Sequence, residues 1–299
     1  MSKIEDALNK AKVNKLKANS IIRTEHSEYT NAEYTNAEHK NSGQLTTIEQ
    51  TEFDTVQYKA SMSEITLMEN GELLEAKQLS DMKIISSKMY DNSIANNYRD
   101  LRTKLIQRCQ GKNFVVMLTS TADDYSSCTT AVNLATAFTF DESKTSLVID
   151  SNINNPQLES CLNCNSGYGL TDYLENEEVN IESVIQKTGI PRLKAISAGK
   201  PREAAYEYYT SLRMRKLLSD LLKRYSDRYI FINSAPIADS ADARILSDLC
   251  DFVILVVPYG KSSKNNINKA VDSIGKDKFA GVVFSEVPRL PSIKNTENR

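Results

Sequence analysis

The residues whose types and spacing could do chemistry lie in a short polar segment between two apolar runs. The segment Phe114–Phe138 reads FVVMLTS, then TADDYSSC, then TTAVNLATAF. The first part is typical of a buried strand, and the last part carries apolar residues at helical spacing, at Ala131, Leu134, Ala135 and Phe138. A strand, a tight loop and a helix form the arrangement in which backbone N–H groups and a helix N-terminus bind phosphate.

The side chains of this loop do not suit that chemistry. A phosphate-binding loop has the pattern G-x-x-x-x-G-K-[ST], in which the glycines allow close approach of the backbone and the lysine reaches the transferred phosphate. The loop TADDYSSC has the required length but contains no glycine and no lysine. The sequence therefore predicts a phosphate-binding layout from which the phosphate-binding side chains are missing.

Two further groups of residues could do chemistry. Ser146–Asp150 reads as a second buried strand that ends in a carboxylate, at the edge of an open parallel sheet where ligands bind. Asp150 is therefore a candidate catalytic residue, although an aspartate at a strand end can equally cap a turn. Cys161 and Cys164 form a lone C-x-x-C, which does not supply the four ligands of a zinc site, so no metal site is predicted.

The elements that must position these residues alternate along the chain. Apolar strands are predicted at 193–197, 228–233, 251–258 and 279–287, and helices at 169–178, 211–225 and 239–250. Because strands alternate with helices, we expect an α/β fold with a mostly parallel sheet and helices on both faces. A further helix, with Ser93 as its N-cap, is predicted from the spacing of Ile94, Tyr98 and Leu101.

The pattern divides the chain into four parts. Residues 1–17 read as a short amphipathic helix, which is either solvated or a docking helix, and residues 18–82 as a polar, low-complexity linker that repeats EYTNA. Residues 83–288 form the predicted domain, and residues 289–299 form a tail. A net charge of −2 does not favour nucleic acid, and no apolar run near 20 residues predicts a membrane span. We therefore expect a cytoplasmic protein with reduced thiols.

From about Asn92 to Val287 the chain resembles the bacterial tyrosine autokinases of capsule and exopolysaccharide synthesis, which are P-loop proteins related to the MinD-like ATPases. The similar blocks, in order, are IANNYRDLRTKL, TSTADDYSSCTTAVNLA, LVIDSNINNP, GLTDYL, AISAGKPREAAYEYYTSLRMRKLL, YIFINSAP and DARILSDLCDFVILVV. By this resemblance, Arg99 and Arg102 match the E-x-x-R-x-x-R oligomerisation helix, with Asn96 in place of the glutamate. Asp150 matches the first aspartate of the Walker A′ motif, whose second aspartate is Asn152 here.

The resemblance also shows which site residues of the family are replaced. In the Walker A segment, Asp124 and Ser126 stand in place of glycines, Ser127 in place of the lysine and Cys128 in place of the magnesium-binding hydroxyl, just before Thr129. A thiol is a poor ligand for Mg²⁺, which prefers oxygen. Asn233 stands in place of the Walker B aspartate, and the C-terminal tyrosine cluster of the family has no counterpart after Tyr259.

We therefore expect a tyrosine-autokinase-like protein that has kept the fold and lost catalysis. It would act as a regulatory or scaffold component of polysaccharide synthesis and export, and contact the cell membrane through a partner. That partner would be a membrane chain-length regulator or an active autokinase subunit. The alternative is an active tyrosine kinase or MinD-like ATPase with an unusual loop, whose cofactors would be ATP and Mg²⁺.

Overall fold

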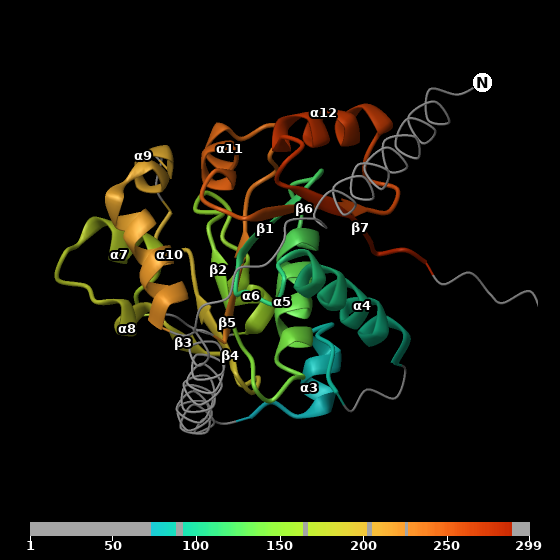
Figure 1. The fold of residues 1–299 in the computed structure, drawn as a ribbon, viewed down its shortest axis with the longest axis horizontal. Helices are drawn as coiled ribbons and strands as arrows, with labels where there is room; N and C mark the ends of the chain where they lie inside the picture. The colour runs from blue at the N-terminus through green and yellow to red at the C-terminus, as the bar shows by residue number, and fades with distance from the viewer. Residues whose placement is uncertain (1–72, 88–91, 164–166, 202–204, 225–226, 289–299) are drawn as a thin grey trace, which may run out of the picture. The chain divides into compact units, whose positions relative to one another are not determined.

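The fold is an α/β fold built on one twisted sheet (Figure 1). The computed structural model describes residues 73–87, 92–163, 167–201, 205–224 and 227–288. Within these residues the sheet has seven strands in the order β3-β4-β2-β5-β1-β6-β7. The strands are β1 (Val115–Ser120), β2 (Thr145–Asp150), β3 (Gln186–Lys187), β4 (Leu193–Ile196), β5 (Arg228–Asn233), β6 (Phe252–Pro258) and β7 (Phe279–Ser285). Every neighbouring pair is parallel except β3 and β4, which confirms the predicted mostly parallel sheet.

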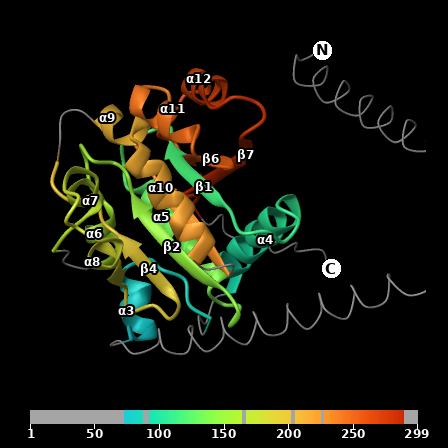
Figure 2. The same ribbon diagram turned by 60° about the vertical axis from the view of Figure 1, so that its left-hand side comes forward.

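Helices cover both faces of the sheet, as Figures 1 and 2 show. They are α3 (Ala76–Asp81), α4 (Asn92–Arg108), α5 (Ser126–Phe138), α6 (Leu158–Leu162), α7 (Leu170–Glu175), α8 (Ile181–Val184), α9 (Ala205–Thr210), α10 (Leu212–Arg224), α11 (Ala241–Ser247) and α12 (Lys264–Ile274). Side chains of β1 alternate between two apolar clusters, because successive residues of a strand point to opposite faces. Val115 and Met117 pack with α10 and α11, whereas Val116 and Leu118 pack with α5.

The central helix α5 is enclosed by the sheet and by α4. All of its side chains except that of Thr129 are buried. At its C-terminal end, the ring of Phe138 lies 5.7 Å from that of Phe114 and 5.2 Å from that of Phe231, so the end of the helix is fixed to the sheet. A helix buried on all sides has small and apolar residues all round, which accounts for the alanines and threonines of its sequence.

The structure differs from the sequence prediction in where two helices begin and in one additional strand. Helix α5 begins at Ser126, inside the segment TADDYSSC that the sequence analysis treated as a loop, because the side chain of Asp124 accepts a hydrogen bond from the first N–H of the helix. Helix α4 includes Ser93 rather than being capped by it. Strand β3 was not predicted, because a two-residue strand has no periodicity to recognise.

The folded region also begins earlier than residue 83. Helix α3 lies in the stretch that the sequence assigned to the linker, yet its Leu79 is buried in the cluster around α5. The backbone N–H of Leu74 donates a 2.8 Å hydrogen bond to the carbonyl of Gly189. The predicted amphipathic helix at residues 1–17, the tail at 289–299 and most of the linker lie outside the described residues. Within the described part of the chain, no helix has both the length and the apolar character needed to cross a bilayer.

Candidate functional site

The candidate site lies where β1, β2 and β5 end. These strands are adjacent in the sheet, so their carboxyl ends bring together Ser120, Asp150 and Asn233. A pocket of about 450 Å³ opens at this edge. It is lined by Thr121, Asp123, Asn152, Asn154, Asn155, Ala235, Pro236, Asp239, Ser240, Ala241 and Asp242. Asp150 and Asn233 do not themselves line this pocket, and the binding of a ligand at this edge stays a prediction.

Asp150 is fully buried and surrounded by hydrogen-bond donors. One carboxylate oxygen accepts from the backbone N–H of Asn152 at 3.1 Å and from the side-chain amide of Asn233 at 3.0 Å. The other accepts from the backbone N–H groups of Gln157 and Leu158 at 2.7 and 2.9 Å. Burial raises the pKa of Asp150, and these four hydrogen bonds act against that rise. The carboxylate therefore fixes the start of α6 and the loop that leads to it.

Asn233 is the partner of Asp150 across the sheet. The two residues stand opposite each other in the pairing of β2 with β5, and both are fully buried. The amide nitrogen of Asn233 is used by Asp150, and its amide oxygen has no hydrogen-bond partner among the described residues. An amide at this position satisfies a buried carboxylate without adding a second negative charge.

The loop between β1 and α5 is closed by the side chain of Asp124. One oxygen of Asp124 accepts from the backbone N–H of Ser126 at 3.0 Å and also from the Ser126 hydroxyl. The other oxygen lies 3.0 Å from the ammonium group of Lys261, which follows β6 and also pairs with Glu286 at 3.0 Å. Partial burial raises the pKa of Asp124, but the hydrogen bonds from Ser126 and Lys261 outweigh it and hold that pKa below its usual value.

The carboxylate of Asp124 thus sits on the first N–H of α5. Helix N-termini attract anions, because their first N–H groups have no partner within the helix and carry partial positive charge. In a phosphate-binding loop this position belongs to the phosphate. Here an anionic side chain of the same loop occupies it, and Lys261 neutralises that side chain from outside.

The other residues predicted to bind a cofactor lie together on the first turn of α5. Ser126 bonds to the hydroxyl of Ser120 at 3.0 Å, and Ser127 and Cys128 are buried. Thr129 is the one side chain of α5 that is not buried, and its hydroxyl lies 3.9 Å from the sulfur of Cys161. The structure therefore brings the predicted residues together, but none of Ser126, Ser127, Cys128 and Thr129 lines the pocket described above.

The pocket itself is acidic. Asp123, Asp239 and Asp242 line it, and among its described lining residues there is no lysine or arginine. Asn155 donates a 3.1 Å hydrogen bond to Asp123, and Lys269 forms a 2.9 Å ion pair with Asp239 from outside the pocket. These three aspartates and Lys261 were not identified from the sequence, because their spacing in loops and in the first turn of α11 matches no recognisable motif.

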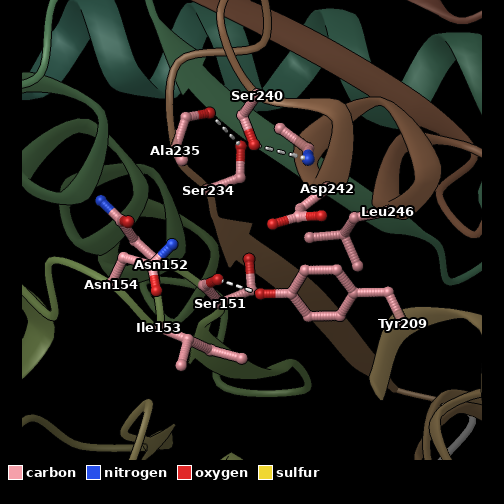
Figure 3. A pocket seen from close by; sticks show the side chains of 11 residues that line it. Ser151, Asn152, Ile153, Asn154, Tyr209, Ser234, Ala235, Ser240, Asp242 and Leu246 are labelled. Carbon is pink, nitrogen blue, oxygen red and sulfur yellow. Dashed lines mark hydrogen bonds between the residues drawn. The ribbon is translucent and has the colours of Figure 1, made fainter. Parts of the chain in front are cut away.

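A tyrosine seals the inner end of the site. Figure 3 shows the ring of Tyr209 pointing toward Ser151, with Asp242 beside it. The hydroxyl of Tyr209 donates to the carbonyl of Ser151, and burial raises the pKa of the phenol. The small cavity enclosed here has a volume of about 20 Å³, which is enough for one water molecule. Helix α9, which carries Tyr209, is thereby joined to the loop after Asp150.

Arg99 and Arg102, the predicted oligomerisation residues, make contacts within their own chain. The guanidinium of Arg102 donates a 2.8 Å hydrogen bond to the carbonyl of Ala137, near the end of α5. Arg99 bonds to the side chain of Asn96 at 2.8 Å and stacks 5.0 Å from the centre of the Phe140 ring. Both residues therefore hold α4 against the end of α5, and a role in oligomerisation stays a prediction.

A parallel sheet whose first strand leads through a tight loop into a buried helix defines the class of P-loop ATPase folds, as the sequence predicted. Comparison with known proteins places the chain within that class. It is 26% identical over 209 residues to the tyrosine-protein kinase CpsD of Streptococcus agalactiae serotype III (strain NEM316), covering 69% of this chain and 88% of that protein. It is 28% identical over 194 residues to the tyrosine-protein kinase YwqD of Bacillus subtilis (strain 168), covering 64% and 80%.

Solved structures agree on the fold. The chimerical protein CapA2B2 superposes with a TM-score of 0.62 at 21% identity, over 72% of this chain and 100% of that chain. The kinase domain of the Escherichia coli tyrosine kinase ETK superposes with a TM-score of 0.59 at 19% identity, over 74% and 92%. No protein-family model matches the chain. The chain is thus a homologue of the bacterial tyrosine-protein kinases, which confirms the resemblance seen in the sequence.

Proposed function

We propose that this chain is a non-catalytic relative of the bacterial tyrosine kinases, which acts as a regulatory or scaffold component of exopolysaccharide or capsule synthesis and export. One observation carries the proposal: the carboxylate of Asp124 occupies the N-terminus of α5, where a nucleotide phosphate would have to bind. A bound phosphate would have to displace this carboxylate and break its ion pair with Lys261.

The charges around the site support the same reading. Two unit charges of the same sign 4 Å apart repel by about 4 kcal/mol at an effective dielectric constant near 20. A triphosphate in this pocket would face Asp123 and Asp242, which line it, and Lys261 is already shared between two carboxylates, those of Asp124 and Glu286. Since micromolar binding corresponds to only about 8 kcal/mol, repulsion of this size is enough to remove useful affinity for ATP.

The residues at the positions where the family would bind Mg²⁺ also support the proposed loss of catalysis. Mg²⁺ binds through carboxylates, hydroxyls and phosphate oxygens. Cys128 presents a buried thiol, and Asn233 presents a neutral amide whose nitrogen is held by Asp150. Asp150 itself directs both oxygens to four protein donors, so using it as a ligand would require those hydrogen bonds to be rearranged.

A retained fold without turnover suits a protein whose task is contact with another protein. We infer that the partner is a membrane chain-length regulator or an active autokinase subunit, and that the chain reaches the inner face of the membrane through it. The genes encoded beside this one offer the candidates for a two-hybrid test, in which a membrane chain-length protein or a kinase should be recovered. Recovery of neither would overturn this part of the proposal.

Isothermal titration calorimetry of the purified chain with ATP and Mg²⁺ tests the loss of catalysis. We expect no heat of binding at micromolar ligand, and no phosphotyrosine after incubation with ATP. The tyrosine-protein kinase CpsD, purified in the same way, is the positive control. The double variant Ser127→Lys with Cys128→Thr should remain inactive, since Asp124, Ser126 and Asn233 are unchanged. Micromolar affinity together with phosphotyrosine on the wild-type chain would instead show an active kinase with an unusual loop.

A further inference from the structure

Two thiols that are far apart in the sequence meet beside the closed loop. Cys128 lies in the first turn of α5 and is fully buried, whereas Cys161 lies in α6 and is partly exposed. Both side chains belong to the same apolar cluster, and the thiol of Cys161 is in hydrogen-bonding contact with that of Cys128. The hydroxyl of Thr129 lies 3.9 Å from the sulfur of Cys161. None of these contacts is used by the function proposed above.

We propose that Cys128 and Cys161 form a peroxide-reactive dithiol, in which Cys161 is the residue attacked and Cys128 the residue that closes a disulfide. The exposure of the two side chains fixes these roles. An oxidant in solution reaches the partly exposed sulfur of Cys161, and the enclosed sulfur of Cys128 can react only with its neighbour.

The surroundings of Cys161 favour the reactive thiolate. Its contact with Cys128 and, to a smaller extent, the Thr129 hydroxyl lower the pKa of the Cys161 thiol. Partial burial and the charge of Asp150 act in the opposite direction but do not outweigh them. Cys109 provides a comparison, because it is also partly exposed. Burial and the neighbouring Asp251 raise the pKa of Cys109 to about 11, so its thiol stays protonated at neutral pH.

The chemistry balances with hydrogen peroxide as the oxidant. The Cys161 thiolate attacks one peroxide oxygen, the O–O bond breaks, and the released hydroxide takes up a proton to become water. The sulfur of Cys128 then attacks the resulting sulfenic acid of Cys161, the S–O bond breaks, and a second water leaves with the Cys128 proton. Two thiols have lost two hydrogens, and one peroxide has been reduced to two waters.

Such a bond would join the start of α5 to α6, whose own start is fixed by Asp150. Oxidation would therefore tie the closed loop, the helix after it and the buried carboxylate into one covalent unit. A cross-link of this kind reduces the freedom of the unfolded chain, so the oxidised protein should unfold at a higher temperature than the reduced one.

Peptide mapping of the full chain after treatment with hydrogen peroxide tests the proposal. Because Cys164 follows closely and lies outside the described residues, the map is made in wild type and in the Cys164→Ser variant. We expect a Cys128–Cys161 disulfide peptide in both, with the loss of two alkylatable thiols. Before oxidation, iodoacetamide should label Cys161 faster than Cys109, because the pKa of the Cys161 thiol is lowered whereas that of the Cys109 thiol is raised to about 11.

Two variants separate the roles. In Cys128→Ser made in the Cys164→Ser background, neither neighbouring thiol can resolve the sulfenic acid of Cys161, so dimedone should trap it there, whereas Cys109→Ser should form the disulfide as wild type does. A disulfide between Cys161 and Cys164 alone, together with no linkage in Cys164→Ser, would overturn the proposal. Equal labelling of Cys109 and Cys161 would also overturn it. The wild-type map decides the matter even if a variant fails to fold.

Discussion

The side-chain amide of Asn233 donates a 3.0 Å hydrogen bond to the buried carboxylate of Asp150, from the residue directly opposite it in the neighbouring strand. The pair shows how a buried carboxylate is stabilised by hydrogen bonds from neutral groups. One fully buried carboxylate, that of Asp150, lies at the end of β2, and its four hydrogen bonds come from donors that carry no charge. A carboxylate at position 233 would place a second buried charge directly opposite the first.

Replacing Asn233 by aspartate should therefore destabilise the protein at neutral pH, by about 3 kcal/mol, since it adds an uncompensated buried charge. Two carboxyl groups at this distance cannot both ionise, so the folded state raises the pKa of the pair above the unfolded value of about 4. The penalty should accordingly be smallest below that pH and grow as the pH rises through the raised pKa. Urea denaturation of Asn233→Asp and wild type across this range measures it.

The control for that experiment is Asn233→Ala, which removes the same hydrogen bond without adding charge. Its penalty should vary much less with pH than that of Asn233→Asp. A flat pH profile for Asn233→Asp would show that the edge of the sheet tolerates a second negative charge, and the electrostatic argument against catalysis would lose its support.

Replacing Asp124 by alanine should cost about 1 kcal/mol at neutral pH, which is typical of losing a helix cap and a partly exposed ion pair. The folded state lowers the pKa of Asp124. Its contribution is therefore fully present above the unfolded pKa of about 4, and it is lost as the pH falls through the lower folded value. Wild type and Asp124→Ala should converge in stability below that value. Asp123→Ala, which changes the neighbouring carboxylate, is the control and should cost less.

Replacing Gly169 by alanine should destabilise the fold by about 3 kcal/mol, because a methyl group has no space there. An added Cβ would lie 2.3 Å from the backbone nitrogen of Gly199 and 2.8 Å from the carbonyl oxygen of Ser197. Gly167 is the matched control, since a Cβ at that position meets nothing within 4 Å. Thermal denaturation of both variants measures the effect, and equal losses in the two would contradict the packing seen in the structure.

Replacing Arg102 by alanine should lower the stability by about 1–2 kcal/mol, because the carbonyl of Ala137 loses a charged donor near the end of α5. Arg99→Ala should cost less, since Arg99 contacts an exposed asparagine and the face of Phe140. Light scattering of the same variants reports the oligomeric state. If the arginines also join copies of the chain, the assembly should dissociate at a protein concentration where each variant is still folded.

Much of the fold could be predicted from the sequence because buried parallel strands are apolar along their whole length. Strands β2, β5 and β6 lie where their apolar runs predicted them, and Asp150 closes β2 at the expected edge. Helix α3 could not be predicted in the same way. Only Leu79 of that helix is buried, and a single apolar residue in a polar stretch shows no periodicity.

The closure of the loop could be predicted only in part. The sequence showed that Asp124 replaces a residue suited to phosphate binding, but Lys261, its ion-pair partner, comes from the segment after β6. Contacts across such a separation depend on the order of strands in the sheet, which no local pattern reports. The early start of α5 follows from the same contact, because the carboxylate of Asp124 accepts the N–H that would otherwise be unsatisfied at Ser126.

The ion pair between Asp124 and Lys261 has a consequence for what the chain can respond to. In a nucleotide switch, the segments around the phosphate are ordered when the γ-phosphate is bound and released when it is hydrolysed. The conformation of such a protein therefore depends on which nucleotide is bound. Here the corresponding segments are joined by charges of the chain itself, and the lysine side chain is 48% exposed. An exposed pair is screened by salt over a distance of roughly 8 Å at physiological ionic strength. If the chain binds no nucleotide, as proposed above, the salt concentration rather than the ratio of ATP to ADP would influence how firmly the loop is held.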